Sequence, residues 1–216
     1  MSKVGKFSVI VVLVATIFSP IAQSQLVLDD FSTAQSTTNN TGPSSVTDEI
    51  AAAGAIGGVR LIRLTNGSTG TSTGSVAGGT ITLSTNVDSD LEVWWDGVDD
   101  DGFTAAGLGG TDLTSGGSFD RFQLDVTANT RPTEDMRIQV WQSGSMRCEV
   151  IFQMPVGIVE VFFSSLTNCT GGATSTSVTE NAGLVLLRTV NRPGAWSFTL
   201  NFVQSTPVEL QVFSVD

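Results

Sequence analysis

Alternation of apolar and polar residues at every second position is the feature that most constrains the fold of this chain. In residues 119–126, Phe122, Leu124 and Val126 alternate with polar residues, and residues 136–141 and 196–202 repeat the pattern. Because successive side chains of a β-strand point to opposite faces, this period indicates strands with one buried face. Further short segments of β-branched and aromatic character are typical of strands: 59–64, 80–83, 91–95, 147–153, 158–163, 184–190 and 208–215.

Stretches of Gly, Ser, Thr and Asn separate these segments. Residues 32–45, 66–79 and 167–179 have this composition and are predicted to be loops, and only residues 48–55 could form a helical turn. Many short strands with no helix between them predict an all-β fold. We expect a two-sheet antiparallel β-sandwich, jelly-roll-like in arrangement, that forms one domain over residues 25–216.

The first 24 residues have the composition of a secretion signal. Lys3 and Lys6 precede an apolar run, and Ala22 and Ser24 are small residues at the two positions that a signal peptidase inspects. The alternative is an uncleaved membrane anchor, but the run is shorter than the roughly 20 apolar residues that a bilayer span needs. Residues 1–24 are therefore predicted to be a signal peptide, and the protein is predicted to be exported.

Removal of the leader leaves an acidic chain with few reactive side chains. The only two lysines lie in the leader, so eight arginines remain against 21 acidic residues, a net charge of −13 instead of −11. Such a charge repels nucleic acid and anionic lipid, because binding to either depends on cationic side chains. With no histidine and no lysine left, imidazole bases, His-rich zinc sites and lysine nucleophiles are excluded. Pairs of carboxylates remain, but 21 acids supply such pairs by chance, so no enzymatic activity is predicted.

The two cysteines, Cys148 and Cys169, lie in the exported part of the chain. An even number of cysteines in an oxidising compartment predicts one disulfide bond, with two free thiols as the alternative.

The densest acidic segment is a candidate calcium loop. Asp96, Asp99, Asp100 and Asp101 precede Gly102. Calcium takes six to eight oxygen ligands, which one acidic loop can supply in part. The spacing does not match an EF-hand, so the alternative is a solvated acidic turn. A structural calcium ion is thus one hypothesis for this segment, and no other cofactor is predicted.

Two tryptophans fall on the polar faces of their predicted strands. Trp94 shares a face with Glu92, and Trp141 shares a face with Arg137 and Gln139. An indole offers a large apolar surface at low entropic cost, so these five residues are candidates for stacking against and hydrogen bonding to sugar rings. The alternative is that both tryptophans are packed beneath a loop or a second sheet.

Five short phrases of the chain resemble those of a known family when they are taken in order. They are Leu28-Asp29-Asp30-Phe31-Ser32, Ile56-Gly57-Gly58-Val59-Arg60, Trp95-Asp96-Gly97, Gly107-Leu108-Gly109-Gly110-Thr111-Asp112-Leu113-Thr114 and Phe119-Asp120-Arg121-Phe122. In this order they are similar to exported bacterial proteins of the PEP-CTERM-sorted type. The resemblance implies a β-sandwich surface protein and supplies no catalytic residues. Residues 206–216 lack the apolar span and basic tail of that family, so we expect a released protein, with a sequence that continues beyond residue 216 as the alternative.

Together these patterns predict a secreted, acidic, non-catalytic β-sandwich protein at the cell surface or in the extracellular matrix. Its expected role is to bind glycan or another matrix component, with extracellular polysaccharide as the partner. The alternative is a structural protein that assembles with copies of itself and binds no small ligand.

Overall fold

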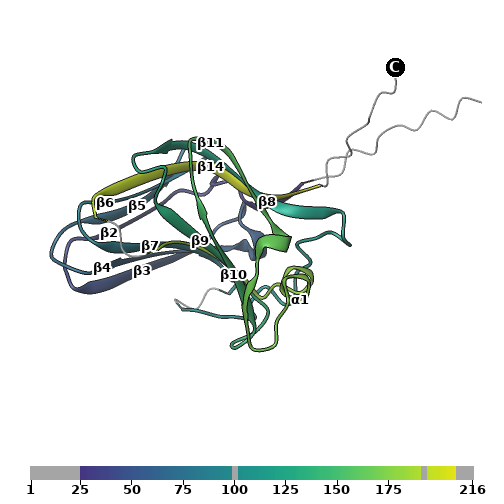
Figure 1. Cartoon of the computed structure of the whole chain (residues 1–216). Helices are drawn as coiled ribbons and strands as arrows, with labels where there is room; N and C mark the ends of the chain where they lie inside the picture. Colours follow the sequence, from purple (N-terminus) through teal and green to yellow (C-terminus); the bar gives the residue numbers. More distant parts are fainter. Residues whose placement is uncertain (1–24, 99–101, 191–193, 208–216) are drawn as a thin grey trace, which may run out of the picture.

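Two antiparallel β-sheets packed face to face make up the described part of the chain, residues 25–98, 102–190 and 194–207 of the computed structural model (Figure 1). In sheet A the strand order is β11-β8-β14-β6-β5-β2, and β1 pairs with the second half of β14. In sheet B the order is β12-β10-β9-β13-β7-β4-β3. The predicted two-sheet β-sandwich is confirmed.

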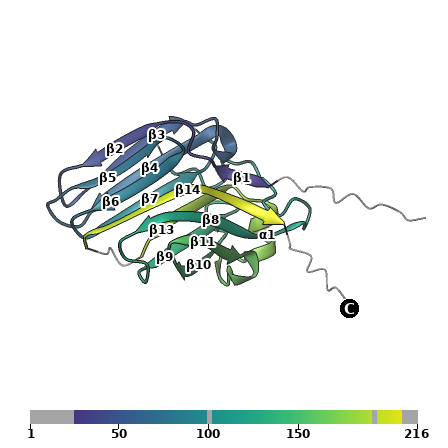
Figure 2. The same ribbon diagram turned by 90° about the horizontal axis from the view of Figure 1, so that it is seen from above.

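The strands of each sheet come from all parts of the chain. Sheet A contains β1 (Leu26–Asp29), β2 (Gln35–Asn39), β5 (Ser72–Ala77), β6 (Thr80–Thr85), β8 (Phe119–Asn129), β11 (Gly157–Phe162) and β14 (Trp196–Pro207). Sheet B contains β3 (Ser44–Ala51), β4 (Val59–Asn66), β7 (Ser89–Trp95), β9 (Asp135–Trp141), β10 (Arg147–Gln153), β12 (Asn168–Thr170) and β13 (Leu184–Thr189). The helical segments are η1 (Ile56–Gly58), η2 (Phe163–Ser165) and α1 (Ser175–Glu180). Seen from above, β1 and α1 lie at the end of the sandwich toward which β14 runs (Figure 2).

The core lies between the sheets and is lined by the alternating apolar residues of the strands. The inward residues include Phe122, Leu124 and Val126 of β8, Met136, Ile138 and Val140 of β9, and Trp196, Phe198 and Leu200 of β14, all of them buried. Burial of this apolar surface is the main favourable term in folding. The strands predicted from period-two alternation and from β-branched and aromatic character are therefore present among the described residues, and the one predicted over residues 208–215 lies outside them.

The three segments predicted to be loops contain strands, so that prediction is wrong. Residues 32–45 contain β2, residues 66–79 contain β5, and residues 167–179 contain β12 and most of α1. Their inward positions carry polar side chains that are satisfied inside the protein: Ser72 Oγ donates to Asn66 Oδ1 at 2.6 Å, and Asn39 Nδ2 donates to the Leu64 carbonyl at 3.0 Å. Because groups of β4 satisfy these side chains of β2 and β5, the polar interior is stable although no apolar alternation marks it.

The helical turn predicted over residues 48–55 is also wrong. Residues 48–51 complete β3, which pairs along its whole length with β4. The six-residue helix α1 lies elsewhere, and Thr174 caps its first turn in a reciprocal pair with Ser177.

The predicted disulfide between Cys148 and Cys169 is present. The two cysteines are directly opposite one another in the ladder between β10 and β12, so the bond fixes the short edge strand β12 to sheet B.

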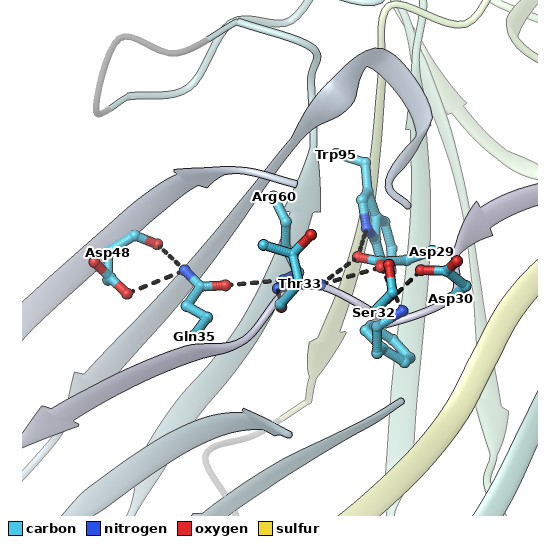
Figure 3. Close-up of polar contacts among 9 residues, drawn as sticks. Asp29, Asp30, Ser32, Thr33, Gln35, Asp48, Arg60 and Trp95 are labelled. Carbon is cyan, nitrogen blue, oxygen red and sulfur yellow. Dashed lines mark hydrogen bonds and ion pairs between the residues drawn. The ribbon is translucent and has the colours of Figure 1, made fainter. Parts of the chain in front are cut away.

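A fully buried ion pair joins the two sheets (Figure 3). Arg60 of β4 donates from Nη1 to the two carboxylate oxygens of Asp29 at 3.1 and 3.0 Å. The indole of Trp95 donates to Asp29 Oδ2 at 2.8 Å, and Arg60 Nε donates to Gln35 Oε1 at 2.8 Å. Gln35 in turn donates to the carboxylate of Asp48, so β1 and β2 of sheet A are tied to β3, β4 and β7 of sheet B.

Three of the short sequence segments that carry the family resemblance lie close together around this ion pair. Besides Asp29, Arg60 and Trp95, two glycines from these phrases approach closely: a Cβ on Gly57 would lie 2.6 Å from the Cα of Gly97. Both glycines also have positive φ, 73° in each case, which favours glycine. These phrases therefore have a structural role in joining the N-terminal strands to sheet B.

The predicted signal peptide, residues 1–24, lies outside the described residues. Among the residues that are described, no helix is long and apolar enough to cross a membrane.

Candidate functional site

The outer face of sheet B, which points away from the core, holds the candidate site. Every residue of β7 is buried, although only Leu91, Val93 and Trp95 point into the core. On the outer face, Trp94 lies opposite Leu61 of β4 and Leu186 of β13 and forms a small second apolar cluster with them. An outer face with this much buried surface is unusual for a solvated sheet, where polar residues normally face water.

Three aromatic side chains and two arginines lie on this face. Phe103 contacts Trp94 edge to face with ring centres 5.2 Å apart, and it contacts Trp141 in the same way at 4.9 Å. The guanidinium of Arg63 lies 5.7 Å from the Trp94 ring centre, and that of Arg147 lies 4.6 Å from the Trp141 ring centre. Phe103 is 42% exposed, whereas Trp94 beneath it is 7% exposed. The face therefore presents an apolar centre with a cation over each tryptophan.

Charged residues of both signs surround the aromatic cluster. Arg188 lies between Asp90 and Glu92, with N–O distances of 3.6 and 3.5 Å, and Arg137 lies 3.5 Å from Glu149. These pairs are partly shielded from water, which strengthens them relative to pairs on an open surface.

Gln139 and Asn168 complete the environment of Glu149. The Gln139 amide donates to Glu149 Oε2, and Asn168 Nδ2 donates to Glu149 Oε1 at 2.7 Å. Both carboxylate oxygens of Glu149 are thus engaged by neighbouring side chains, which holds this part of the face rigid.

Burial raises the pKa of the Glu92 carboxyl above its ordinary value. The nearby guanidinium groups of Arg188 and Arg63 and the hydrogen bond from Trp94 Nε1 act in the opposite direction, and the negative charge of Asp90 adds to the rise. The effect of burial on the pKa of Glu92 therefore outweighs the opposite effect of the two arginines.

Several N–H groups on this face have no hydrogen-bond partner within the described chain. They are buried nitrogen atoms: Nε of Arg137, Arg147 and Arg188, and Nε1 of Trp141. An unsatisfied buried donor costs about 1–3 kcal/mol.

A cavity of about 150 Å³ opens on this face beside Trp94. Its walls are Thr47 of β3, Leu61 and Arg63 of β4, Trp94 of β7, and Gly102 and Phe103 of the following segment. Apolar walls with a few polar groups are typical of small-molecule sites, and this volume is about half the lower bound of roughly 300 Å³ for drug-sized ligands. The cavity can therefore accommodate one small ring.

The structure brings together the five residues that the sequence selected for ligand binding. All five lie on the outer face of sheet B, on strands β7 and β9, which are separated by β13: Trp94, Trp141, Glu92, Arg137 and Gln139. Trp94 is not openly exposed, because Phe103 lies against it, whereas Trp141 is half-buried. Direct stacking on Trp94 therefore requires Phe103 to form part of the site.

Sequence reasoning missed Phe103, Arg63 and Arg147. The two arginines stand at outward positions of β4 and β10, so the alternation itself could have assigned them to this face. Nothing in the alternation predicts Phe103, because it lies outside the predicted strands and follows the acidic segment of the sequence.

Of the four aspartates proposed to bind calcium, only Asp96 lies in the described residues. It is buried and accepts hydrogen bonds from the backbone N–H groups of Val98 at 3.3 Å and Thr104 at 3.1 Å. Asp99, Asp100 and Asp101 lie outside the described residues. Within the described ranges no group of three or more His, Cys, Asp or Glu side chains is placed to hold a metal ion. The calcium site remains a hypothesis.

Comparison with known proteins gives distant structural similarities. No family model matches the sequence, and no curated protein sequence is similar to it. A family 11 carbohydrate-binding module from Clostridium thermocellum, solved with a β-1,3-1,4-mixed-linked tetrasaccharide, has 10% identity and a TM-score of 0.40 over 85% of this chain and 95% of its own. A family 29 carbohydrate-binding module has 10% identity and a TM-score of 0.34 over 81% of this chain and 90% of its own. The agarase AgWH50C has 12% identity and a TM-score of 0.44 over 86% of this chain and 25% of its own. At these identities and TM-scores the similarities are too distant to transfer a function.

Proposed function

We propose that this protein is an exported, non-catalytic module that binds polysaccharide on the outer face of sheet B. Export depends on the leader predicted over residues 1–24, and the bound polysaccharide would belong to the cell surface or the extracellular matrix. The residues of the outer face, rather than the distant structural similarities, support this role.

The cavity beside Trp94 is the observation that carries the proposal. It combines an apolar floor of Trp94 and Leu61 with the guanidinium of Arg63 and the hydroxyl of Thr47 at its rim. A sugar ring has apolar C–H faces and equatorial hydroxyls, so it needs an aromatic surface together with hydrogen-bonding groups beside it. On the other side of Phe103, the half-buried Trp141 and Arg147 again place an aromatic surface beside a hydrogen-bond donor. This second pair suits a second sugar ring of a polymer.

Charge favours a neutral polysaccharide over an acidic one. Arg63, Arg137, Arg147 and Arg188 on the outer face are matched by Glu49, Asp90, Glu92 and Glu149, while the whole chain has a net charge of −11. Long-range repulsion therefore opposes the approach of a polyanion. A neutral chain is not repelled and can accept hydrogen bonds from the arginines.

Affinity electrophoresis and calorimetry with a neutral β-glucan, a neutral xylan and the acidic polysaccharide alginate test this proposal. We expect binding to at least one neutral polymer, and binding about tenfold weaker, or about 1.4 kcal/mol, in Arg63→Ala and in Trp141→Ala. Arg131→Ala is the matched control, because Arg131 is an exposed arginine that pairs with Glu134 away from this face. Binding that is equally strong in all four proteins would place the site elsewhere, and absence of binding to every polymer would refute the role.

Self-assembly is a second candidate, favoured by one exposed corner of the sandwich. The strand β11 pairs only with β8 among the described strands, so its other edge is open. Large apolar side chains are exposed at this corner: Ile151 of β10, Val156 in the turn, and Ile158 of β11. Open apolar edges pair readily with other chains. Analytical ultracentrifugation over a range of concentrations tests this role, and Ile158→Lys should abolish any association that it detects.

A further inference from the structure

A crevice of about 230 Å³ lies at the end of the sandwich where β8 begins and where η2 and α1 pack against each other. Its lining residues are Thr114, Phe119, Asp120, Phe162, Phe163, Ser164, Ser175, Thr176 and Thr179. None of them lines the cavity beside Trp94. The two hollows are therefore separate features of the molecule.

One wall of the crevice is an exposed aromatic ring in a fixed position. Phe162 is 43% exposed, and the guanidinium of Arg121 lies 4.6 Å from its ring centre. Arg121 is held from two sides, by Asp120 at 2.7 Å and by Glu160 at 3.1 Å. These two hydrogen bonds also raise the pKa of Arg121. An aromatic ring held in this way loses little conformational freedom when a ligand covers it.

The lining of the crevice also contains hydroxyl groups that are free to bind. The side chains of Ser164, Ser175 and Thr176 make no hydrogen bond to any other described residue, whereas the Thr114 hydroxyl donates to Asp112 and the Thr179 hydroxyl donates to the Ser175 carbonyl. Each free hydroxyl can donate one hydrogen bond and accept two. The lining of the crevice thus combines an aromatic ring with three hydroxyl groups.

From this combination we infer that the crevice is a second ligand site, which takes one neutral sugar residue such as a chain end or a monosaccharide. The ring of Phe162 covers the apolar face of the sugar, while the three hydroxyls and the carboxylate of Asp120 bind its hydroxyl groups. Asp120 and Glu160 outnumber Arg121, so the local charge is negative and disfavours an anionic ligand. The volume is below the roughly 300 Å³ of drug-sized ligand sites, which limits the site to a single ring.

Titration of ¹⁵N-labelled protein with methyl β-D-glucoside and with methyl β-D-galactoside, followed by amide chemical shifts, tests this inference. We expect saturable shifts at Asp120, Ser164 and Thr176 with at least one glycoside. Phe162→Ala should weaken this binding by about tenfold, the loss expected for one aromatic contact. Thr176→Val, which keeps the shape of an exposed side chain and removes only its hydroxyl, should also weaken it.

Ile158→Ala is the matched control, because Ile158 is an exposed apolar residue on the same face of β11 but does not line the crevice. The affinity of Ile158→Ala for the glycosides should equal that of the parent protein. Absence of saturable shifts with both glycosides, or shifts that persist unchanged in Phe162→Ala and Thr176→Val, would overturn the inference.

The outcome is separable from that of the proposed function. Trp141→Ala alters only the outer face of sheet B, so it should leave the glycoside shifts at the crevice unchanged. Phe162→Ala should likewise leave the electrophoretic binding of polysaccharide by the outer face unchanged. Either site can therefore fail its test while the other passes.

Discussion

Replacement of Arg60 by methionine tests whether the buried ion pair holds the two sheets together. Arg60 and Asp29 are both 0% exposed, and Arg60 also donates to Gln35 and to the Thr33 carbonyl. Arg60→Met removes the cation and leaves the Asp29 carboxylate in the core with only Trp95 Nε1 and the Phe31 N–H as donors.

The expected loss follows from the charge that is left behind. Removal of one partner of a buried ion pair typically costs about 3–5 kcal/mol, because the other charge remains without compensation. A domain has a free energy of unfolding of about 5–15 kcal/mol, so Arg60→Met should lose a large part of it. Arg131→Met is the control, because the exposed pair of Arg131 with Glu134 should contribute only about 0–1 kcal/mol.

Urea unfolding followed by tryptophan fluorescence measures these losses, since Trp95 itself belongs to the network. The double variant Asp29→Asn with Arg60→Met contains neither charge. We expect it to be less destabilised than the sum of the two single variants by about 2 kcal/mol, within the range found for residues in contact. A loss below about 1 kcal/mol in Arg60→Met, or exact additivity in the double variant, would refute the reasoning.

Other predictions concern the disulfide, the pKa of Glu92 and the cover of Trp94. Replacement of Cys148 and Cys169 by serine should lower the free energy of unfolding by about 3 kcal/mol, and a urea midpoint equal to that of the oxidised parent would contradict this. Because the folded-state pKa of Glu92 is raised above 4.5, the proton is held more tightly in the folded than in the unfolded protein. Its contribution to stability is therefore fully present below pH 4.5 and is lost as the pH rises through the raised value. Urea unfolding at a series of pH values should show this loss in the parent and not in Glu92→Gln, and parallel profiles would refute it. Phe103→Ala should expose Trp94 and shift the fluorescence emission to longer wavelength, with a stability loss of about 1 kcal/mol for the aromatic contacts; an unchanged spectrum would show that Phe103 does not cover the indole.

The period-two alternation of the sequence was sufficient to predict the class of fold and most strands of the core. The β-branched and aromatic character of residues 147–153 predicts β10 at its observed bounds, and the alternation separates the inward residues of β8 and β9 from the outward ones. The same rule assigned Trp94 and Trp141 to outward positions. Alternation is a local property of an extended backbone, and for this reason the sequence reveals it directly.

The polar strands β2 and β5 could not be predicted in this way. Their inward positions hold residues such as Asn39 and Ser72, which are stable in the interior only because partners on β4 satisfy them. The partner of Asn39 is Leu64, 25 residues away along the chain, so the segment around Asn39 does not show by itself that this residue is buried. Asn66, the partner of Ser72, is only six residues away, but the local sequence does not show that either side chain faces the interior.

The tertiary structure alone decided what the outer face of sheet B presents. Alternation indicates that Glu92 and Trp94 point outward, but it cannot show that Phe103 covers Trp94 or that burial raises the pKa of Glu92. The crevice beside Phe162 likewise arises where β8, η2 and α1 meet. The physical reason is the same in both cases: the sequence of a strand determines which way a side chain points, whereas exposure and pKa depend on the distant segments that pack over it.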